Sequence, residues 1–215
     1  MPDFENILFD LDGTLTDPKV GIINSILFSL KKLRITEPKP VELERFIGPP
    51  LRQSFKERYD LSDALADKAV VYYREYFSEK GIFENACYEG VPELLNFLSA
   101  SDFKLFLATS KPTVFADRIL QHFELKKYFI DIIGCNLDHT RTEKTEIIDY
   151  LIKKHKLAKE KTIMIGDRKH DLIGAASNNV KSIAVTYGYG TIEELTESQP
   201  DFFAKDSREL KSLLT

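Results

Sequence analysis

The chain has 215 residues, 43% of them hydrophobic and 30% charged, a composition that excludes a disordered chain and fits one large domain or a main domain with a smaller one. Its formal net charge of -4 provides no broad positive field for a polyanion, so nucleic acid is not expected as a partner. Cys87 and Cys135 form neither a disulfide framework nor a zinc motif. Residues 1–6 lack the features of a signal peptide, and no stretch is apolar for long enough to span a bilayer. We therefore expect a cytoplasmic protein without a membrane partner.

Five short apolar segments predict the strands of a parallel sheet. They are residues 7–9, 105–108, 130–133, 163–165 and 183–185. Continuous rather than alternating hydrophobicity is typical of strands that are covered on both faces. Segments with helical spacing of apolar residues lie between them, at 114–123 and 147–152, and Thr191 with Glu194 indicates a capping box of a short helix. This alternation predicts a doubly wound, Rossmann-like parallel α/β sheet.

A helical insertion is expected directly after the first strand. Apolar residues keep helical spacing through 22–33 and 65–77, and no buried-strand segment interrupts them. The stretch 37–40, Glu-Pro-Lys-Pro, predicts a loop inside this insertion. We therefore expect a discontinuous α/β core domain at 1–16 and 87–215, and a helical cap domain at 17–86 that lies over the strand ends.

The first acidic pair follows immediately on the first predicted strand, in Asp10-Leu11-Asp12-Gly13-Thr14. Residues two apart in an extended backbone point to the same side, and the carboxyl ends of parallel strands are where such sheets bind ligands. Two close carboxylates need a cation or a shared proton, and they supply a nucleophile together with an acid or base. A turn with capping aspartates explains the same five residues, since Asp-Gly is common in turns.

Two further strand ends carry polar side chains. Thr109 and Ser110 follow the second predicted strand, where hydroxyls and backbone amides suit phosphate oxygens, although a helix N-cap explains them as well. Asp167 and Asp171 follow the fourth, and they share a face if a helical turn begins at Asp167. An ordinary acidic helix start is the alternative for this second pair. That alternative does not explain why acids and hydroxyls recur at several strand ends.

Lys144 opens the predicted helix before the fourth strand. Most lysines are solvated, and nothing distinguishes this one in isolation. A site that holds several carboxylates and a phosphate, however, needs more positive charge than one divalent ion supplies. Lys144 is therefore a candidate counter-charge.

Four motifs together resemble the haloacid dehalogenase superfamily, and within it the phosphoglycolate phosphatase branch with a small helical cap. In chain order they are Asp10-Leu11-Asp12-Gly13-Thr14, Thr109-Ser110, Lys144 and Gly166-Asp167-x-x-x-Asp171. The resemblance covers essentially the whole chain. The two aspartate motifs are highly specific, whereas the lone threonine and lysine are weak signals.

The resemblance implies a magnesium-dependent phosphatase that acts on a small phosphorylated metabolite. Asp10 would attack phosphorus and become an aspartyl phosphate, while Asp12 would protonate the leaving oxygen and then activate water. The carboxylates of Asp10 and Asp167 and the backbone carbonyl of Asp12 would bind magnesium, with Asp171 as an outer ligand. Hard oxygen ligands suit magnesium, and positioning with charge neutralisation is most of what phosphoryl transfer needs.

The resemblance also implies the residues that hold the substrate. Thr109, Ser110 and Lys144 would bind the transferring phosphoryl group. Residues 47–52, Ile-Gly-Pro-Pro-Leu-Arg, resemble the cap loop of this family, so Gly48 and Arg52 are candidate specificity residues. Arg52 would meet a second anionic group, and a solvated arginine at a helix start is the equally simple alternative.

Several alternatives stay open at this point. A 5′-nucleotidase, a pyrophosphatase or a phosphomutase would use the same core chemistry. A phospho-receiver domain also has an acidic pair, a hydroxyl and a lysine, but it needs a further phosphorylatable Asp at the end of its third strand. Here that strand is expected to end near Gly134-Cys135-Asn136, and Asp138 lies two residues beyond. A phosphate-binding protein without activity is the remaining possibility. The sequence leaves monomer and homodimer equally open.

Overall fold

The structure, a computed structural model, describes residues 4–36, 43–137 and 140–215. Two compact units make up the chain: Met1–Asp17 joins Cys87–Thr215 in one, and Pro18–Ala86 forms the other. The role of the second unit as a cap stays a prediction. The loop expected at 37–40 and Asp138 of the receiver alternative lie outside the described residues.

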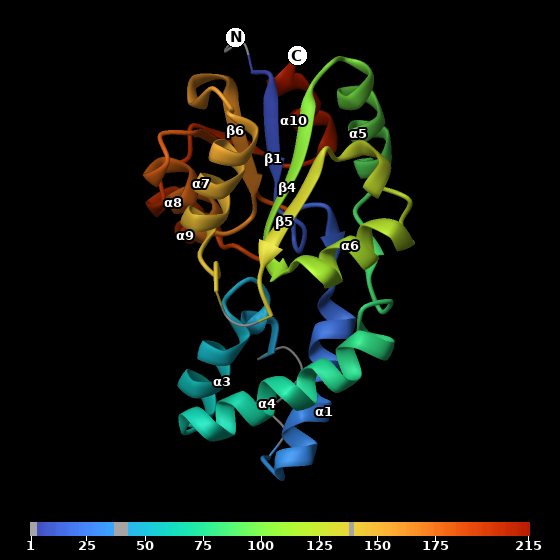
Figure 1. Cartoon of the computed structure of the whole chain (residues 1–215), viewed down its shortest axis with the longest axis vertical. Helices are drawn as coiled ribbons and strands as arrows, with labels where there is room; N and C mark the ends of the chain where they lie inside the picture. Colours follow the sequence, from blue (N-terminus) through green and yellow to red (C-terminus); the bar gives the residue numbers. More distant parts are fainter. Residues whose placement is uncertain (1–3, 37–42, 138–139) are drawn as a thin grey trace. The chain divides into compact units, whose positions relative to one another are not determined.

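The larger unit is built on a six-stranded sheet with the order β5-β4-β1-β6-β7-β8, in which all neighbouring strands are parallel (Figure 1). The strands are β1 (Asn6–Phe9), β4 (Lys104–Pro112), β5 (Asp131–Cys135), β6 (Thr162–Gly166), β7 (Lys181–Val185) and β8 (Phe202–Ala204). The predicted doubly wound parallel sheet is confirmed. The apolar pattern did not predict β8, because this strand has only three residues and one of its two phenylalanines is exposed.

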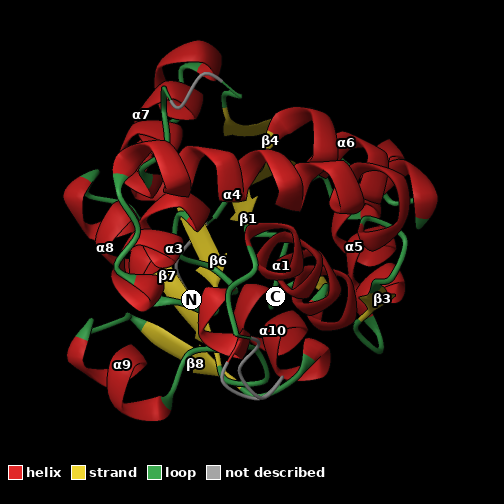
Figure 2. Cartoon of the chain, turned by 90° about the horizontal axis from the view of Figure 1, so that it is seen from below, coloured by secondary structure: helices red, strands yellow, loops and turns green. Residues whose placement is uncertain are grey.

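Helices cover both faces of this sheet. On one face α7 (Lys144–His155) and α8 (Lys169–Ser177) pack on the strands, with α9 (Ile192–Glu197) against α8. On the other face lie α5 (Val91–Ala100) and α6 (Thr113–His122), with α10 (Ser207–Leu214) against α5 and β8 (Figures 1 and 2). Short elements outside the helical unit, or at its end, are β2 (Thr16–Asp17), β3 (Ala86–Cys87), and the 3-10 turns η3 (Lys126–Tyr128) and η4 (Lys159–Lys161).

The register of the central strands builds the core. Leu8 of β1 lies between Phe106 of β4 and Met164 of β6, and all three side chains are almost completely buried. They form one cluster with apolar residues of α7, including Ile147 and Ile148. Burying a leucine or phenylalanine stabilises the fold by roughly 1.5–3 kcal/mol. This core fixes the strand ends, which carry the polar side chains.

In the described residues of the unit Pro18–Ala86, the regular structure up to Gly81 is helical. Its elements are α1 (Lys19–Leu33), the 3-10 turn η1 (Glu44–Phe46), α3 (Leu51–Tyr59), α4 (Asp63–Tyr76) and the π-helical turn η2 (Phe77–Gly81). Helices α1 and α4 pack on each other, and the Ser29 hydroxyl donates to the carbonyl of Ala69 at 2.8 Å. The apolar residues whose helical spacing predicted these elements include buried residues of α1 and α4.

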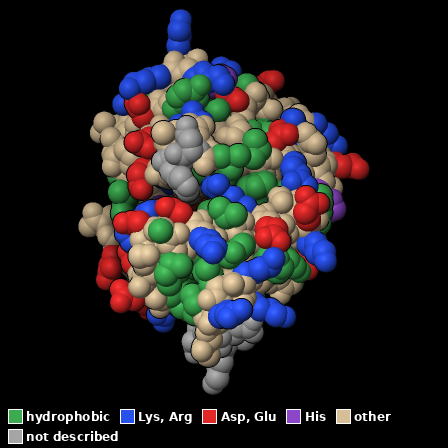
Figure 3. Space-filling model, turned by 60° about the horizontal axis from the view of Figure 1, so that its bottom comes forward, with side chains coloured by type: hydrophobic (Ala, Val, Ile, Leu, Met, Phe, Trp, Pro, Cys, Tyr) green, Lys and Arg blue, Asp and Glu red, His purple; other side chains and the backbone are tan. Residues whose placement is uncertain are grey.

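The surface carries charges of both signs. Lysine and arginine side chains are interspersed with aspartate and glutamate side chains on the face that Figure 3 shows. Such a mixture matches the small net charge of -4. None of the helices in the described part of the chain is long and apolar enough to cross a membrane.

Candidate active site

The topology singles out the carboxyl ends of β1 and β6. These strands are neighbours, yet the chain continues from β1 to β4 on one side and from β6 to β7 on the other. Ligands of doubly wound sheets bind in the crevice where the strand order reverses in this way. Asp10 is the first residue after β1, and Asp167 is the first residue after β6.

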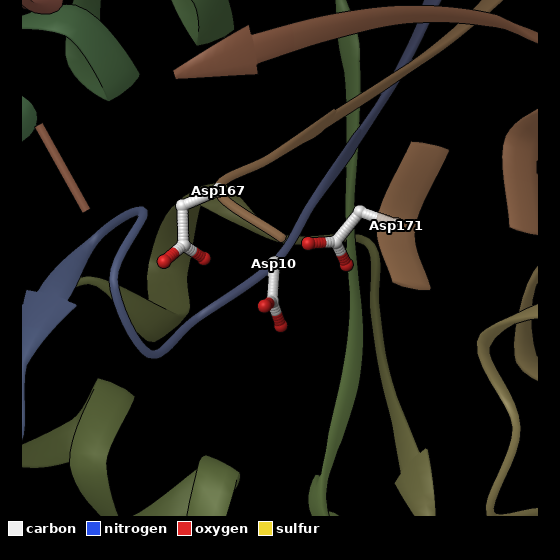
Figure 4. A group of neighbouring side chains, drawn as sticks. All are labelled: Asp10, Asp167 and Asp171. Carbon is white, nitrogen blue, oxygen red and sulfur yellow. The ribbon is translucent and has the colours of Figure 1, made fainter. Parts of the chain in front are cut away.

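Three carboxylates meet at this point (Figure 4). Asp10, Asp167 and Asp171 each offer an oxygen atom, and these atoms all lie within 4.8 Å of one another. All three side chains are buried, and their relative exposures are 6%, 0% and 1%. Buried carboxylates at this distance repel one another unless positive charge compensates them, so the cluster could hold a metal cation.

The turn after β1 requires the glycine of the first motif. Gly13 has φ +85°, and a Cβ atom there would lie 2.1 Å from Oδ2 of Asp167. The amides of Leu15 and Thr16 both donate to the carbonyl of Leu11, which closes the turn. Thr14 adds a weak contact from its hydroxyl to Oδ1 of Asp167 at 3.4 Å. The Asp-Gly-Thr sequence is therefore a turn, as its simpler interpretation expected, and it is also the wall of the acidic cluster.

The second acidic pair sits differently from the shared helical face considered above. Helix α8 begins at Lys169 rather than at Asp167, with Arg168 at the N-cap. Asp171 is thus the third residue of the helix, and its Oδ2 accepts the backbone N–H of Arg168 at 3.1 Å. Asp167 precedes the helix in the loop. The two carboxylates converge through this loop geometry and not through an i, i+4 relation.

Lys144 is the cation of the cluster. It is the first residue of α7, and its ammonium lies 2.8 Å from Oδ1 of Asp10 and 2.6 Å from Oδ1 of Asp171. A third bond goes to the carbonyl of Ala108 at 2.6 Å. An ammonium group has three N–H donors, so these acceptors use all of them. Burial by itself would lower the pKa of Lys144, but Asp10 and Asp171 raise it above its usual value.

Burial raises the pKa values of three acids at this site, Asp167, Asp171 and Asp12. Burial and the neighbouring Asp171 and Asp10 raise the pKa of Asp167 well above its usual value, against a hydrogen bond from the Tyr189 backbone N–H. Burial raises the pKa of Asp171 to about 6, although Lys144 opposes the shift. Burial also raises the pKa of Asp12. Lys144 by itself does not neutralise Asp10, Asp167 and Asp171, so further positive charge from a cation would be favourable at this cluster.

The end of β4 provides hydroxyls and a second lysine. Thr109 is buried and Ser110 is half-buried, and the Thr109 hydroxyl accepts the backbone N–H of Lys111 at 3.3 Å. Lys111 was not among the predicted site residues. Its ammonium lies 2.7 Å from Oδ2 of Asp12. A usable signal was present, because Lys111 stands two residues after Thr109 in an extended segment and such residues share a side.

The loop after β7 was also missed. Its residues 187–190 are Tyr-Gly-Tyr-Gly, and the backbone N–H of Tyr189 donates to Oδ2 of Asp167 at 2.8 Å. The Tyr187 hydroxyl donates to the carbonyl of Thr14 at 2.9 Å, and the Tyr189 hydroxyl donates to Asp17. A Cβ on Gly188 would lie 2.4 Å from Asp167. Aromatic residues in a loop carry no sequence signal for such a backbone contact.

Gly48 and Arg52, the two candidate specificity residues, belong to the helical unit. Gly48 has φ +103°, which favours glycine. Arg52 Nη2 donates to Oδ1 of Asp63 at 2.7 Å, and Nε donates to Oδ1 of Asp67 at 2.5 Å. The arginine is therefore paired rather than simply solvated. Its role in selecting a substrate stays a prediction.

Comparison with known proteins gives a consistent set of relatives. The family model of haloacid dehalogenase-like hydrolases matches residues 7–185. A protein named 5′-nucleotidase from Pseudomonas aeruginosa is 48% identical over 98% of this chain and 96% of its own length. A phosphoglycolate phosphatase from Vibrio parahaemolyticus is 30% identical over 97% of this chain and 95% of its own.

Two further comparisons extend this set. The protein named tyrosine-protein kinase PtkA from Mycobacterium tuberculosis is 33% identical over 86% of this chain, which spans 62% of that longer protein. The crystal structure of "a predicted phosphatase" from Clostridium acetobutylicum is 44% identical, covers 98% of both chains and has a TM-score of 0.95.

Proposed function

Because the chain belongs to the haloacid dehalogenase-like hydrolases, we propose that it is a magnesium-dependent phosphatase which hydrolyses a small phosphorylated metabolite through an aspartyl phosphate on Asp10. The superfamily and the enzyme class, phosphoric monoester hydrolase, are confirmed by the phosphatases among the relatives. The metal, the individual residue roles and the substrate are the proposal. The convergence of Asp10, Asp167 and Asp171 beside Lys144 is the observation that carries it.

The donor set fits magnesium. Carboxylate oxygens are hard ligands, and protein-bound magnesium usually keeps several of its waters. The carboxylates of Asp10 and Asp167, with the backbone carbonyl of Asp12, would hold the ion. Asp171 would act as an outer ligand, as the resemblance implies, and its two oxygens lie against Lys144 and the Arg168 amide. When bound, the cation would neutralise charge on the phosphoryl oxygens.

The protein's own residues would then carry two steps. A carboxylate oxygen of Asp10 attacks phosphorus, and the bond between phosphorus and the leaving oxygen breaks. The leaving oxygen keeps the electron pair of that bond and receives a proton from Asp12. Water next attacks the phosphorus, Asp12 takes the proton of the water, and the bond to Asp10 breaks to release phosphate. Thr109, Ser110 and Lys144 would orient the phosphoryl group, and Lys144 would exchange one of its present acceptors for a phosphoryl oxygen.

The order of candidate substrates follows the relatives. The protein named 5′-nucleotidase shares 48% identity with this chain, against 30% for the phosphoglycolate phosphatase. We therefore place nucleoside 5′-monophosphates first and phosphoglycolate second. Pyrophosphate and sugar phosphates complete the panel.

The first experiment measures phosphate release from this panel with Mg²⁺ and after EDTA treatment. Free inorganic phosphate supports a hydrolase, whereas an isomeric sugar phosphate without net release would show a mutase. Transfer of label from ATP to a tyrosine peptide would instead favour an activity like that in the name of the mycobacterial relative. Absence of Mg²⁺-dependent turnover on every ester would refute the proposed function.

The Asp10→Asn variant tests the nucleophile. We expect turnover to fall by at least about 10³-fold, because an amide does not form the acyl phosphate, while the fold is retained. Phosphate release and circular dichroism measure the two effects. Near-normal hydrolysis by a folded Asp10→Asn protein would remove Asp10 from the nucleophile's role.

A further inference from the structure

Lys111 and Asp12 form a second buried ion pair of the α/β unit, separate from that of Lys144. The Lys111 ammonium lies 2.7 Å from Oδ2 of Asp12, and the two side chains are only 7% and 13% exposed. A buried pair of this kind is costly to desolvate and is retained where its geometry serves a purpose or is well satisfied. The two lysines divide the acids between them: Lys144 contacts Asp10 and Asp171, and Lys111 contacts Asp12.

The two oxygens of Asp12 have different surroundings. Oδ2 accepts from Lys111, whereas Oδ1 is buried and makes no hydrogen bond within the described part of the chain. Buried polar atoms in folded proteins nearly always have a partner, so an exception needs an explanation. A carboxyl group that accepts at Oδ2 is still able to carry its proton on Oδ1. The pairing therefore leaves one defined oxygen for a ligand.

The backbone that carries Lys111 is held firmly. The parallel register between β4 and β5 shifts between Ala108 and Pro112, so Lys111 lies within an irregular segment of the strand. Gly134 of β5 permits the close approach of this segment, since a Cβ there would lie 2.1 Å from the carbonyl of Lys111. The Lys111 amide also donates to the Thr109 hydroxyl. A side chain that starts from such a fixed backbone loses little further freedom when it pairs with Asp12.

We propose that Lys111 is a positioning residue that turns Oδ1 of Asp12 toward the leaving oxygen of the substrate. This inference rests on the proposed function, in which Asp12 gives its proton to that oxygen as the bond to phosphorus breaks. Without Lys111 the carboxyl group of Asp12 rotates about its terminal torsion, and its proton points toward the leaving oxygen less often. The loss is then largest for leaving groups that need the proton most.

Two aryl esters test this dependence, because phenol is a more basic leaving group than p-nitrophenol and the two esters otherwise bind alike. The probes are phenyl phosphate and p-nitrophenyl phosphate, and the measured quantity is kcat/KM, which reports the step that expels the leaving group. We expect Lys111→Met to lower kcat/KM for phenyl phosphate at least tenfold more than for p-nitrophenyl phosphate. Lys111→Arg, which keeps the charge and a donor, should restore most of the difference.

The controls separate this inference from the proposed function. Lys153→Met removes an exposed lysine that pairs with Asp149, and it should change neither substrate. If Lys111→Met does not fold, Lys111→Gln replaces it, since glutamine keeps a donor without the charge. An equal loss on both esters, or an effect confined to KM, would overturn the role of Lys111. Failure of the unmodified protein to hydrolyse either ester with Mg²⁺ would instead count against the proposed function.

Discussion

Lys144 shows how strongly one side chain depends on its acceptors. It is almost completely buried, and its three donors are met by Asp10, Asp171 and a backbone carbonyl. Removing one partner of a buried ion pair leaves an uncompensated charge, which typically costs about 3–5 kcal/mol. The same ammonium therefore serves both the folded state and the proposed phosphoryl site.

The Lys144→Met variant should lose about 3–5 kcal/mol of unfolding free energy in the absence of divalent cations. Urea denaturation in EDTA measures this change. Lys153→Met is the matched control, because its lysine is 74% exposed and surface pairs contribute little. A Lys144→Met protein as stable as the unmodified one would contradict the importance of this pairing.

Arg52 poses the opposite case of an exposed, paired cation. Its contacts to Asp63 and Asp67 engage Nε and Nη2. A guanidinium has five N–H donors, so among the described residues donors remain for a further anion. We expect Arg52→Ala to lower kcat/KM for phosphoglycolate several-fold more than for p-nitrophenyl phosphate, which lacks the second anionic group. Lys56→Ala, which removes another partner of Asp63, is the control. Unchanged ratios across anionic substrates would exclude Arg52 as a selector.

At the scale of elements, the loop between β7 and α9 contacts the acidic cluster at Asp167. Tyr189 holds Asp167 through its backbone N–H, and Gly188 allows the chain to approach the carboxylate. In Gly188→Ala the new Cβ would lie 2.4 Å from Asp167 and from the carbonyl of Gly13. A contact this short is not tolerated, so we expect the Asp167 carboxylate to shift away from the new methyl group.

We expect Gly188→Ala to weaken Mg²⁺ binding at least tenfold while the protein stays folded. Isothermal titration with Mg²⁺ measures the affinity directly. Tyr189→Phe is the comparison, because it loses the hydroxyl contact to Asp17 but keeps the backbone N–H, and it should retain the affinity. Equal affinities of Gly188→Ala and the unmodified protein would show that this loop does not position Asp167.

At the scale of the whole molecule, the buried acids make stability depend on pH and on cations together. The folded-state pKa values of Asp167 and Asp171 are raised above the usual value of 3.8. The folded state therefore binds more protons than the unfolded chain. The stability that these bound protons contribute is present below about pH 4. It is lost as the pH rises through the pKa values of the folded state, and for Asp171 this pKa is about 6.

A divalent cation should replace these protons. We expect Mg²⁺ to raise the melting temperature more at pH 8 than at pH 5, because protons compete with the ion for the carboxylates at the lower pH. Calorimetry at both pH values, with Mg²⁺ and with EDTA, measures the two increments. The difference between increments cancels the pH effects of groups far from the cluster. An equal or larger increment at pH 5 would contradict a carboxylate site for the cation.

Local patterns in the sequence determined the fold class. Continuous apolar runs such as Ile7–Phe9 predict doubly covered strands because burial on both faces leaves no place for alternating polar residues. The acids and hydroxyls after these runs predicted a site at the carboxyl ends of the sheet. The family resemblance followed from the same motifs. All of these features depend on residues that are near one another in the chain.

Partner choice was decided only by the tertiary structure. Thr191 caps α9 as expected, but the Glu194 carboxylate binds Arg168 and the Lys169 amide instead of completing a capping box. Lys111 pairs with Asp12 across 99 positions of the chain. Such pairs depend on strand order, on the irregular end of β4 and on glycines that let another backbone segment approach closely. No local periodicity encodes them, since the two partners meet only after the sheet has formed.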